Sequence, residues 1–305
     1  MKLDAIQMFV AAAEQGSFAA VARKRSVAPS SISRAVADLE AELKLRLFQR
    51  TTRRLSLTEA GRAYLERVRP LLEDLRVAHD HARDLDSGPS GLLRVAMAPE
   101  MANVHSVNWL PQLRARHPRL QLELVLGAAL VDLIAERIDV ALRMGPMRPS
   151  SAMVRKLSDM PRVLVASPRR LGKRRRLLPE ALTREPCLSF PHEGFDGAWK
   201  LRDGRGQLHT VVPNQVMVAN NGLVLRDLAL AGEGFTVLPR LIIYRELATG
   251  TLVDAFPDYQ VTNTDFGEVV SLMYPSRRYL PLKVKVFVDF MTELFRNGPP
   301  WERGG

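Results

Sequence analysis

A short run of turn-forming residues, Ser87-Gly88-Pro89-Ser90-Gly91, divides this sequence into two parts with different apolar patterns. Before it, apolar residues recur every three or four positions, as on one face of an α-helix. After it, short apolar runs alternate with stretches of helical spacing, which predicts strands separated by helices. The chain has 305 residues, whereas a single hydrophobic core rarely grows beyond about 250–300 residues. The sequence therefore predicts more than one domain.

The first part opens with three predicted helices. The first ends at Gly16, and Ser17 supplies the N-cap of the second. A third helix is expected to start at Pro29, because proline suits the first position of a helix. Its inward stripe is formed by Ile32, Val36, Leu39 and Leu43.

The outer face of the third helix is narrow, small and positively charged at one point. It carries Ser30, Arg34, Ala37 and Ala41, with Ser33 on the flank. Small side chains let a helix approach the DNA major groove, where an arginine can contact guanine through two hydrogen bonds. The alternative is a solvated helix of an ordinary three-helix bundle. The residues that we predict to contact DNA from this helix are Pro29, Ser30, Ser31, Ser33 and Arg34.

A basic segment follows the third helix. Residues 1–57 contain ten Lys and Arg against five Asp and Glu, in a chain of net charge +11. The alternating Leu55-Ser56-Leu57 predicts a short strand. Hydroxyl and guanidinium groups on a β-ribbon beside a groove-reading helix are suited to bind phosphate oxygens. The predicted DNA contacts of this wing are Arg50, Thr51, Thr52, Arg53 and Arg54.

A long helix is predicted after Thr58, which is a suitable N-cap. Its apolar residues alternate spacings of four and three, which is the heptad pattern of a helix packed on a partner helix. The alternative is that this seam packs on its own chain, since Pro70 would also kink an isolated helix. The predicted dimerisation residues are Tyr64, Val68, Leu71, Leu75, Ala78, Ala82 and Leu85.

The second part predicts an α/β domain with parallel sheets. In such sheets ligands bind beyond the carboxyl ends of strands, often at helix N-termini. The loops that follow the predicted strands, together with one helix start, therefore supply the candidate ligand contacts. These are Ala98, Pro99, Glu100, Met101, Ala128, Ala129, His192, Asn220 and Asn221.

Several segments of the chain follow a specific order and spacing. In the N-terminal part these are Phe9, Gly16-Ser17-Phe18, Ala19-Ala20-Val21-Ala22, Ser30-Ser31-Ile32-Ser33-Arg34, Leu39-Glu40, Leu47-Phe48, Arg50-Thr51-Thr52-Arg53 and Leu57-Thr58-Glu59-Ala60-Gly61. In the second part they are residues 119–126, 131–134, 139–145 and 231–235, with Leu238-Pro239. In this order and spacing the segments resemble the LysR-type transcriptional regulators, most specifically in the N-terminal part and more weakly in the second part.

The resemblance implies a fold and a division of the chain. An all-α winged helix-turn-helix would occupy residues 1–58, and a linker helix with a hinge residues 59–90. A two-lobed α/β domain like the type 2 periplasmic binding proteins would occupy residues 91–297. The two crossings place lobe I at residues 91–160 and 267–297, and lobe II at residues 161–266. A small-molecule effector is expected in the cleft between the lobes.

The family also implies partners and an assembly. Its members form dimers and tetramers, so we expect a homodimer or homotetramer on double-stranded DNA. Two-fold symmetry predicts an inverted-repeat promoter site with half-sites about one DNA turn apart, or a multiple of it.

Two positions depart from the family pattern. Ala28 stands where relatives often carry a capping Ser or Thr, whose loss typically costs about 1 kcal/mol. Near the end of the first strand of the second part, relatives often carry a Ser or Thr that holds an effector carboxylate. Here Ala98-Pro99-Glu100-Met101 stands instead. If Glu100 faces the cleft, an apolar or cationic effector is expected; the alternative is that Glu100 faces solvent.

The sequence contains no constellation typical of an enzyme. It lacks a G-x-S-x-G elbow, an H-E-x-x-H helix and a Walker loop. The segment Gly204-Arg205-Gly206 lacks the third glycine of a dinucleotide fingerprint and predicts a hairpin turn. His79 and His81 diverge on a helix, and the single Cys187 lies in an apolar stretch where a buried thiol is expected. We therefore expect no catalytic residue, no metal site and no cofactor.

The location and the class of function follow from the same observations. No apolar run approaches the about 20 residues of a membrane span, and the start lacks the sections of a secretory signal. We expect a cytoplasmic protein that does not bind membranes. A second basic cluster at residues 162–176 indicates a solvated loop or, alternatively, a contact with bent DNA or RNA polymerase.

Three classes of function compete. A ligand-responsive transcription factor explains both parts of the chain. An architectural protein that binds DNA without sequence preference leaves the second part unused. A solute-binding or catalytic α/β protein explains only the second part. We therefore predict the first.

Overall fold

A computed structural model describes residues 3–50, 55–127, 133, 136–147, 152–174, 177–192, 196–276 and 280–302. The side chains of residues 50, 73, 76, 77 and 80–87 lie outside this description. Residues 1–86 with 277–281 form one compact unit, and residues 87–276 with 282–305 form the other.

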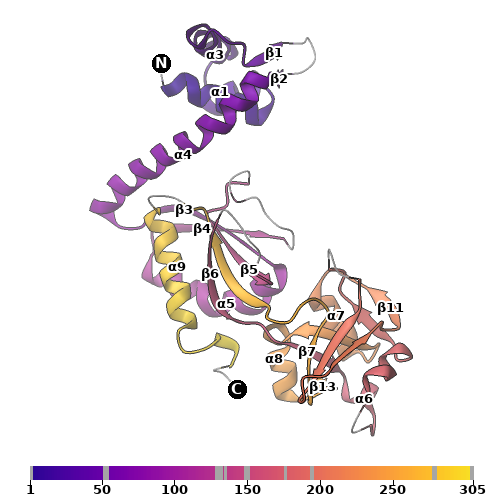
Figure 1. The fold of residues 1–305 in the computed structure, drawn as a ribbon. Coiled ribbons are helices and arrows are strands. Elements are labelled where there is room, and N and C mark those ends of the chain that lie inside the picture. The colour runs from indigo at the N-terminus through magenta and orange to yellow at the C-terminus, as the bar shows by residue number, and fades with distance from the viewer. Residues whose placement is uncertain are drawn as a thin grey trace. The chain divides into compact units, whose positions relative to one another are not determined.

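The N-terminal unit is a helical bundle with a two-stranded ribbon (Figure 1). Its elements are α1 (Leu3–Gln15), α2 (Phe18–Arg25), α3 (Pro29–Leu43), β1 (Phe48–Arg50), β2 (Leu55–Leu57) and α4 (Glu59–Ser87). Helix α2 begins at the predicted cap, where the Ser17 hydroxyl accepts a hydrogen bond from Ala20 N at 3.3 Å. Strands β1 and β2 pair antiparallel. The three predicted helices and the predicted strand at residues 55–57 are therefore confirmed.

Aromatic side chains form the centre of this unit. Phe9 is fully buried, and its ring centroid lies 5.4 Å from that of Phe48 and 5.5 Å from that of Tyr64. The inward stripe of α3 packs into the same core through Ile32, Val36 and Leu39. Ring pairs at this distance add to the free energy gained by apolar burial. The core thus joins the ribbon and the start of α4 to the helices.

The second unit contains two sheets, which we call lobe I and lobe II (Figure 1). Among the described residues, the lobe I sheet has five strands in the order β4 (Leu120–Leu126), β3 (Gly91–Met97), β5 (Val140–Gly145), β15 (Val269–Tyr274) and β6 (Met153–Asp159). Its other elements are α5 (Pro99–Arg116), α9 (Leu282–Phe295) and η2 (Pro300–Glu302).

In lobe II the described residues form a sheet of eight strands. Seven follow the order β10 (Leu208–Val211), β9 (Trp199–Asp203), β14 (Tyr259–Thr262), β7 (Arg162–Ala166), β12 (Phe235–Pro239), β8 (Cys187–Ser189) and β11 (Gln215–Val218), while β13 (Val253–Asp254) pairs with β7. Its helices are α6 (Pro168–Leu171), η1 (Pro179–Thr183), α7 (Gly222–Leu230) and α8 (Arg240–Thr249).

Both sheets are mixed, so the prediction of parallel sheets was wrong in part. Strand β3 pairs parallel with β4 and β5, and β8 pairs parallel with β11 and β12. Strand β15, however, runs antiparallel to both β5 and β6, and β7 runs antiparallel to β12. The reason is the double crossing: the chain leaves lobe I after β6 and returns as β15, so the returning strand enters the sheet in the opposite direction.

A buried ion pair joins α9 to the sheet of lobe I. Lys283 Nζ donates to Asp139 Oδ2 and to the Leu92 carbonyl, both at 2.6 Å. Asp139 Oδ2 also accepts from Arg94 N at 3.0 Å. A buried charge is tolerated when it is paired and hydrogen-bonded in this way.

Between the lobes, Met160 N donates to the Glu268 carbonyl at 2.9 Å, which joins the two crossing segments.

Two smaller predictions are confirmed. Gly204-Arg205-Gly206 forms the turn of the β9–β10 hairpin, where Asp203 Oδ1 accepts from Arg205 N and Gln207 N, each at 2.9 Å. Cys187 is fully buried, and burial raises the pKa of its thiol to about 12. The thiolate, which is the reactive form, is therefore absent at neutral pH.

Among the described residues, no helix is long and apolar enough to cross a membrane.

Candidate DNA-binding surface and interlobe cavity

Helix α3 presents the predicted DNA-contacting residues on its outer side. Pro29, Ser30, Ser31 and Arg34 are exposed, and Ser33 is half-buried. The core-facing residues Ile32 and Val36 leave these side chains facing away from the bundle. The side chains on this surface are small, and one of them carries a guanidinium group. A helix that enters the major groove needs both properties.

The wing lies only partly within the described residues. Arg50 ends β1, but its side chain is not described, and the predicted contacts Thr51, Thr52, Arg53 and Arg54 lie outside the described residues. Strand β1 is nevertheless fixed to the end of α3. Glu40 is buried, and its Oε1 accepts from Leu47 N at 2.7 Å and from Phe48 N at 3.0 Å. One carboxylate thus joins the helix to the ribbon.

Glu40 is a positioning residue that we did not single out from the sequence. A signal was present, because Glu40 follows Val36 by one helical turn and so falls on the inward stripe. A charged residue on such a stripe requires hydrogen-bond partners, which the following main chain supplies. Thr58 completes the junction: its Oγ1 donates to the Arg46 carbonyl at 2.6 Å and accepts from Gly61 N at 2.9 Å.

Gly61 has no room for a side chain. A Cβ at this position would lie 2.0 Å from the Leu47 carbonyl oxygen, which belongs to the main chain and cannot easily move. The close approach brings the first turn of α4 against the start of β1. The Leu57-to-Gly61 segment of the family pattern therefore has a packing reason in this chain.

The N-cap of α3 bears out the departure noted in the sequence. Ala28 has the extended backbone of an N-cap, φ −69° and ψ 141°, but makes no side-chain capping hydrogen bond. We expect Ala28→Ser to stabilise the N-terminal unit by about 1 kcal/mol, because a hydroxyl here can accept a helix-end N–H. Amide hydrogen exchange over residues 29–36 measures this as slower exchange. Ala41→Ser, on the exposed middle of the same helix, is the control and should not slow exchange.

The seam of α4 is not a single interface. Val68 is buried and Tyr64 partly buried in the core of the N-terminal unit, so these two contact their own chain. The prediction that Val68 faces a partner helix is therefore wrong, because α4 starts packed on α1, to which Arg69 adds an ion pair with Glu14 at 3.0 Å. For Tyr64, which keeps part of its surface exposed, it stays a prediction. Leu71 and Ala78 are exposed and Leu75 is half-buried. The side chains of Ala82 and Leu85 lie outside the described residues.

A cavity of about 160 Å³ lies between the lobes of the second unit. Lobe I contributes the end of β3 (residues 96–98), residues 141–144 of β5, Gly127 and Glu100. Lobe II contributes residues 237–239 at the end of β12, with further contacts from the crossing and from the ends of β8, α7 and α8. These further lining residues are Met160, Arg162, Phe190, His192, Gly222 and Ile242. The cavity therefore forms where strands of both sheets end, as expected for such folds.

The structure brings together only some of the predicted effector contacts. Ala98, Glu100 and His192 line the cavity. Pro99 and Met101 do not, because residues 99–101 form the first turn of α5, not a loop, and Met101 turns into the core. Asn220 and Asn221 also do not line it; instead, Asn221 caps α7. Ala128 and Ala129 lie outside the described residues.

Charged and titratable groups in the cavity are largely neutralised. Arg162 donates two hydrogen bonds to Glu268, at 2.5 and 3.1 Å, and Thr264 Oγ1 donates to the same carboxylate at 2.7 Å. Burial, aided by the positive charge of Arg162, lowers the pKa of His192 to about 4. His192 is therefore a neutral imidazole at physiological pH, and its ring stacks on Phe190 with centroids 4.7 Å apart.

Glu100 faces the cavity and not solvent. Its side chain is buried, and its Oε1 accepts a hydrogen bond of 2.8 Å from Gly222 N, the first residue of α7. The bond crosses from lobe I to lobe II. Among the two alternatives drawn from the sequence, the inward orientation is thus the observed one.

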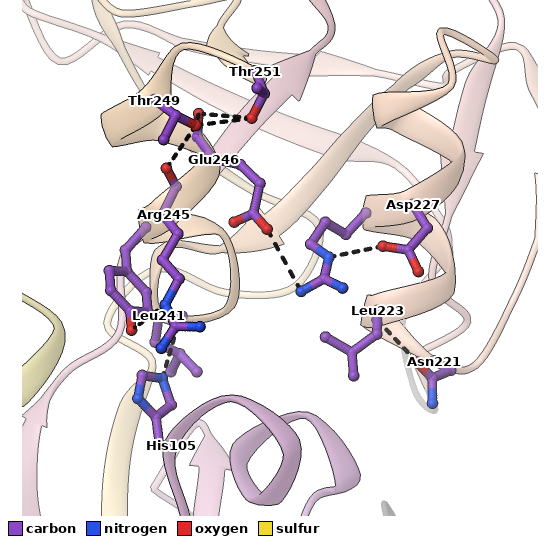
Figure 2. A network of polar contacts seen from close by, with 11 residues as sticks. His105, Asn221, Leu223, Asp227, Leu241, Arg245, Glu246, Thr249 and Thr251 are labelled. Atoms are coloured by element: carbon purple, nitrogen blue, oxygen red, sulfur yellow. Dashed lines mark hydrogen bonds and ion pairs between the residues drawn. The ribbon is translucent and has the colours of Figure 1, made fainter. Parts of the chain in front are cut away.

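A second contact from α5 crosses to lobe II (Figure 2). His105 Nε2 lies 2.8 Å from the Leu241 carbonyl oxygen, which can only accept, so this nitrogen carries the proton. The His105 ring stacks on Tyr244 and lies 4.9 Å from the Trp301 ring near the C-terminus. Burial lowers the pKa of His105. Beyond it, Arg226 of α7 pairs with Asp227 and with Glu246 of α8.

The described part of the second basic cluster is largely used within the fold. Arg162 is paired as above, Arg170 donates to the Glu233 carbonyl, and Arg174 donates to main-chain carbonyls and pairs with Glu185. Residues 175 and 176 lie outside the described residues. Among the described residues, no group of three or more His, Cys, Asp and Glu is arranged to hold a metal ion.

Comparison with known proteins agrees with both units. A family model described as the LysR substrate binding domain matches residues 86–296, and one described as the bacterial regulatory helix-turn-helix protein of the lysR family matches residues 3–62. The transcriptional regulator PtxR of Pseudomonas aeruginosa is 33% identical over 300 residues, which cover 98% of this chain and 95% of PtxR.

Solved structures of related proteins match nearly the whole chain. The LysR-type transcriptional regulator CrgA of Neisseria meningitidis is 30% identical with a TM-score of 0.61, covering 97% of this chain and 100% of CrgA. The virulence activator AphB of Vibrio cholerae is 27% identical with a TM-score of 0.61 over the same shares. These relatives are transcriptional regulators and not enzymes. The chain therefore belongs to the LysR family of transcriptional regulators.

Proposed function

We propose that this chain is a sequence-specific DNA-binding regulator whose second unit senses a small molecule. The observation that carries this is the exposed face of α3, where small side chains surround Arg34 while the opposite face is buried. In this proposal α3 enters the major groove and the wing at residues 50–54 contacts phosphates. The groove contacts specify the sequence, and the phosphate contacts fix the register.

We propose the interlobe cavity as the effector site. It is lined by both lobes, so a ligand bound there contacts elements that can move relative to one another. A ligand shifts a conformational equilibrium only by binding one arrangement more tightly than the other. Effector binding would in this way change how the lobes close, how the subunits associate and how the bound DNA bends.

We propose a homodimer or homotetramer as the active form. On α4, Leu71 is 65% exposed and continues with Leu75 and Ala78 along the predicted seam. In lobe II, β11 is an edge strand, and its apolar residues Val216 and Val218 are more than half exposed. An exposed apolar edge strand is a surface that another chain readily covers. A two-fold dimer would bind an inverted repeat.

A salt-titrated binding comparison tests this proposal. The full chain is measured on the intergenic DNA beside its own gene and on random duplex of equal length. A preference that survives at physiological salt supports sequence-specific regulation. If both duplexes bind alike and binding disappears as salt rises, the protein is the architectural alternative. A contact of the second basic cluster with bent DNA or RNA polymerase stays the alternative to a solvated loop; among its described cations, Arg169 and Lys173 are exposed.

Removing one phosphate contact should affect all DNA equally. Arg53→Ala is expected to weaken binding to specific and random duplex by the same factor and to reduce the slope of log K against log salt by about 1. The measurement is the same titration. A loss confined to the specific duplex would show that Arg53 reads bases and does not hold the backbone.

A further inference from the structure

We infer that Glu100 selects the effector: it occupies the helix end where a ligand carboxylate would bind, so the cavity excludes ligands that carry a carboxylate. This inference rests on the proposed role of the cavity as the effector site. The N-terminus of a helix attracts anions because its first N–H groups lack partners within the helix. In this chain one of its own carboxylates fills that place.

The N-terminus of α7 has no donor left for a ligand. The four N–H groups of residues 222–225 all have acceptors within the chain. Gly222 N donates to Glu100 Oε1 at 2.8 Å. Leu223 N and Val224 N donate to Asn221 Oδ1 at 2.9 and 3.3 Å, and Leu225 N donates to the Asn221 carbonyl at 3.3 Å. An incoming carboxylate would have to displace Glu100.

Packing also holds the Glu100 carboxylate in place. A Cβ built on Gly222 would lie 2.9 Å from Ile242 Cδ1 and 3.5 Å from Glu100 Cγ, so the helix end and the side chain are in close contact. One and a half turns along α5, His105 makes the second bond to lobe II. Helix α5 is thus fastened to lobe II at two points, and Glu100 cannot easily swing away.

Two of the other charged or titratable groups do not favour an anion. Arg162 is matched by Glu268, and His192 is neutral. Arg143, which also lines the cavity, is half-buried and has an interaction of its own. A second carboxylate beside Glu100 would be repelled at close range in a site of low dielectric. Between these groups the lining is apolar, with Met97, Leu142 and Phe190 among its side chains.

The volume matches a small ligand. The cavity measures about 160 Å³, and an engineered apolar cavity of roughly 150 Å³ binds benzene. A single ring without a carboxylate is therefore the class of molecule that fits. Benzamide and benzoate are a suitable pair of probes, because they have nearly the same shape and differ by one negative charge.

The first experiment tests the contact itself. Amide hydrogen exchange of the full chain is followed over residues 219–226. In Glu100→Ala, exchange at Gly222 should be about tenfold faster or more, because a hydrogen bond to a charged acceptor is lost. Glu233→Ala, which removes an exposed carboxylate from lobe II, is the control and should leave that rate unchanged. Equal exchange at Gly222 in the wild type and Glu100→Ala would overturn the inference.

The second experiment tests selectivity. Thermal unfolding of lobe II is followed with benzoate or benzamide present. Benzoate should stabilise Glu100→Ala, in which the helix end is vacant, and should leave the wild type unaffected; benzamide should not favour the variant in this way. Equal responses of the two proteins to benzoate, whether both bind or neither, would overturn the inference.

A conservative variant covers the case in which Glu100→Ala does not fold. Glu100→Gln keeps an acceptor for Gly222 N and loses the charge, so benzoate should stabilise it more than the wild type. No gain over the wild type would count against the inference. Neither experiment uses DNA, so loss of sequence-specific binding would refute the proposed function and leave these results standing.

Discussion

Glu40→Ala is expected to destabilise the N-terminal unit by about 3 kcal/mol, since each buried donor left without an acceptor costs about 1–3 kcal/mol. The variant removes the acceptor of both Leu47 N and Phe48 N. It also releases β1 from the end of α3, so the wing loses its fixed position. Binding to all DNA should fall as a consequence, although Glu40 itself would not contact DNA.

Hydrogen exchange of α1 and α3 in the full chain measures this loss. The tryptophans Trp109, Trp199 and Trp301 all lie in the second unit, so their fluorescence should report an unchanged unfolding midpoint there. Asp38→Ala, an exposed carboxylate on the same helix, is the matched control. Glu40→Gln should recover part of the stability because its amide oxygen can accept the same bonds. Similar exchange in Glu40→Ala and Asp38→Ala would contradict the role given to Glu40.

Arg34→Ala is expected to abolish the preference for the specific site. A bidentate contact to guanine contributes about 1–3 kcal/mol of discrimination, which is roughly tenfold for each half-site and about a hundredfold for a dimer. Binding to random duplex should fall far less, because only one of many charges is removed. Competition between specific and random duplex at fixed salt measures the ratio.

Arg34→Lys separates charge from geometry. Lysine keeps the positive charge but lacks the planar pair of donors, so its site preference should fall nearly as far as that of Arg34→Ala while binding to random DNA is kept. If Arg34→Ala and Arg53→Ala each lose affinity equally on both duplexes, the division between a reading helix and a phosphate-binding wing is wrong.

Local pattern was sufficient for most elements. The helix starts at Phe18 and Pro29, the strand at residues 55–57 and the hairpin turn at Gly204-Arg205-Gly206 were all predicted from caps, spacing and turn residues. These signals act over a few residues, because a cap or a turn satisfies groups within its own segment. The specific order of motifs in the N-terminal part is likewise sufficient to indicate the family.

Side chains that join distant segments could not be predicted in the same way. Glu100 and Gly222 are far apart in sequence, and their bond depends on how the two lobes meet. The α4 pattern looked like a continuous dimer seam, yet Tyr64 and Val68 pack on their own bundle. A heptad pattern shows that a face is apolar and leaves open which surface covers it.

The sequence by itself determined the helices of the N-terminal unit, the change to an α/β unit after residue 91 and the family. Only the tertiary structure decided the direction of β15, the partners of Glu40 and the orientation of Glu100. The physical reason is the separation in sequence between the residues that interact. Propensity, capping and periodicity are properties of neighbouring residues, whereas a strand's direction and a buried carboxylate's partners are set by segments that meet only after the chain has folded.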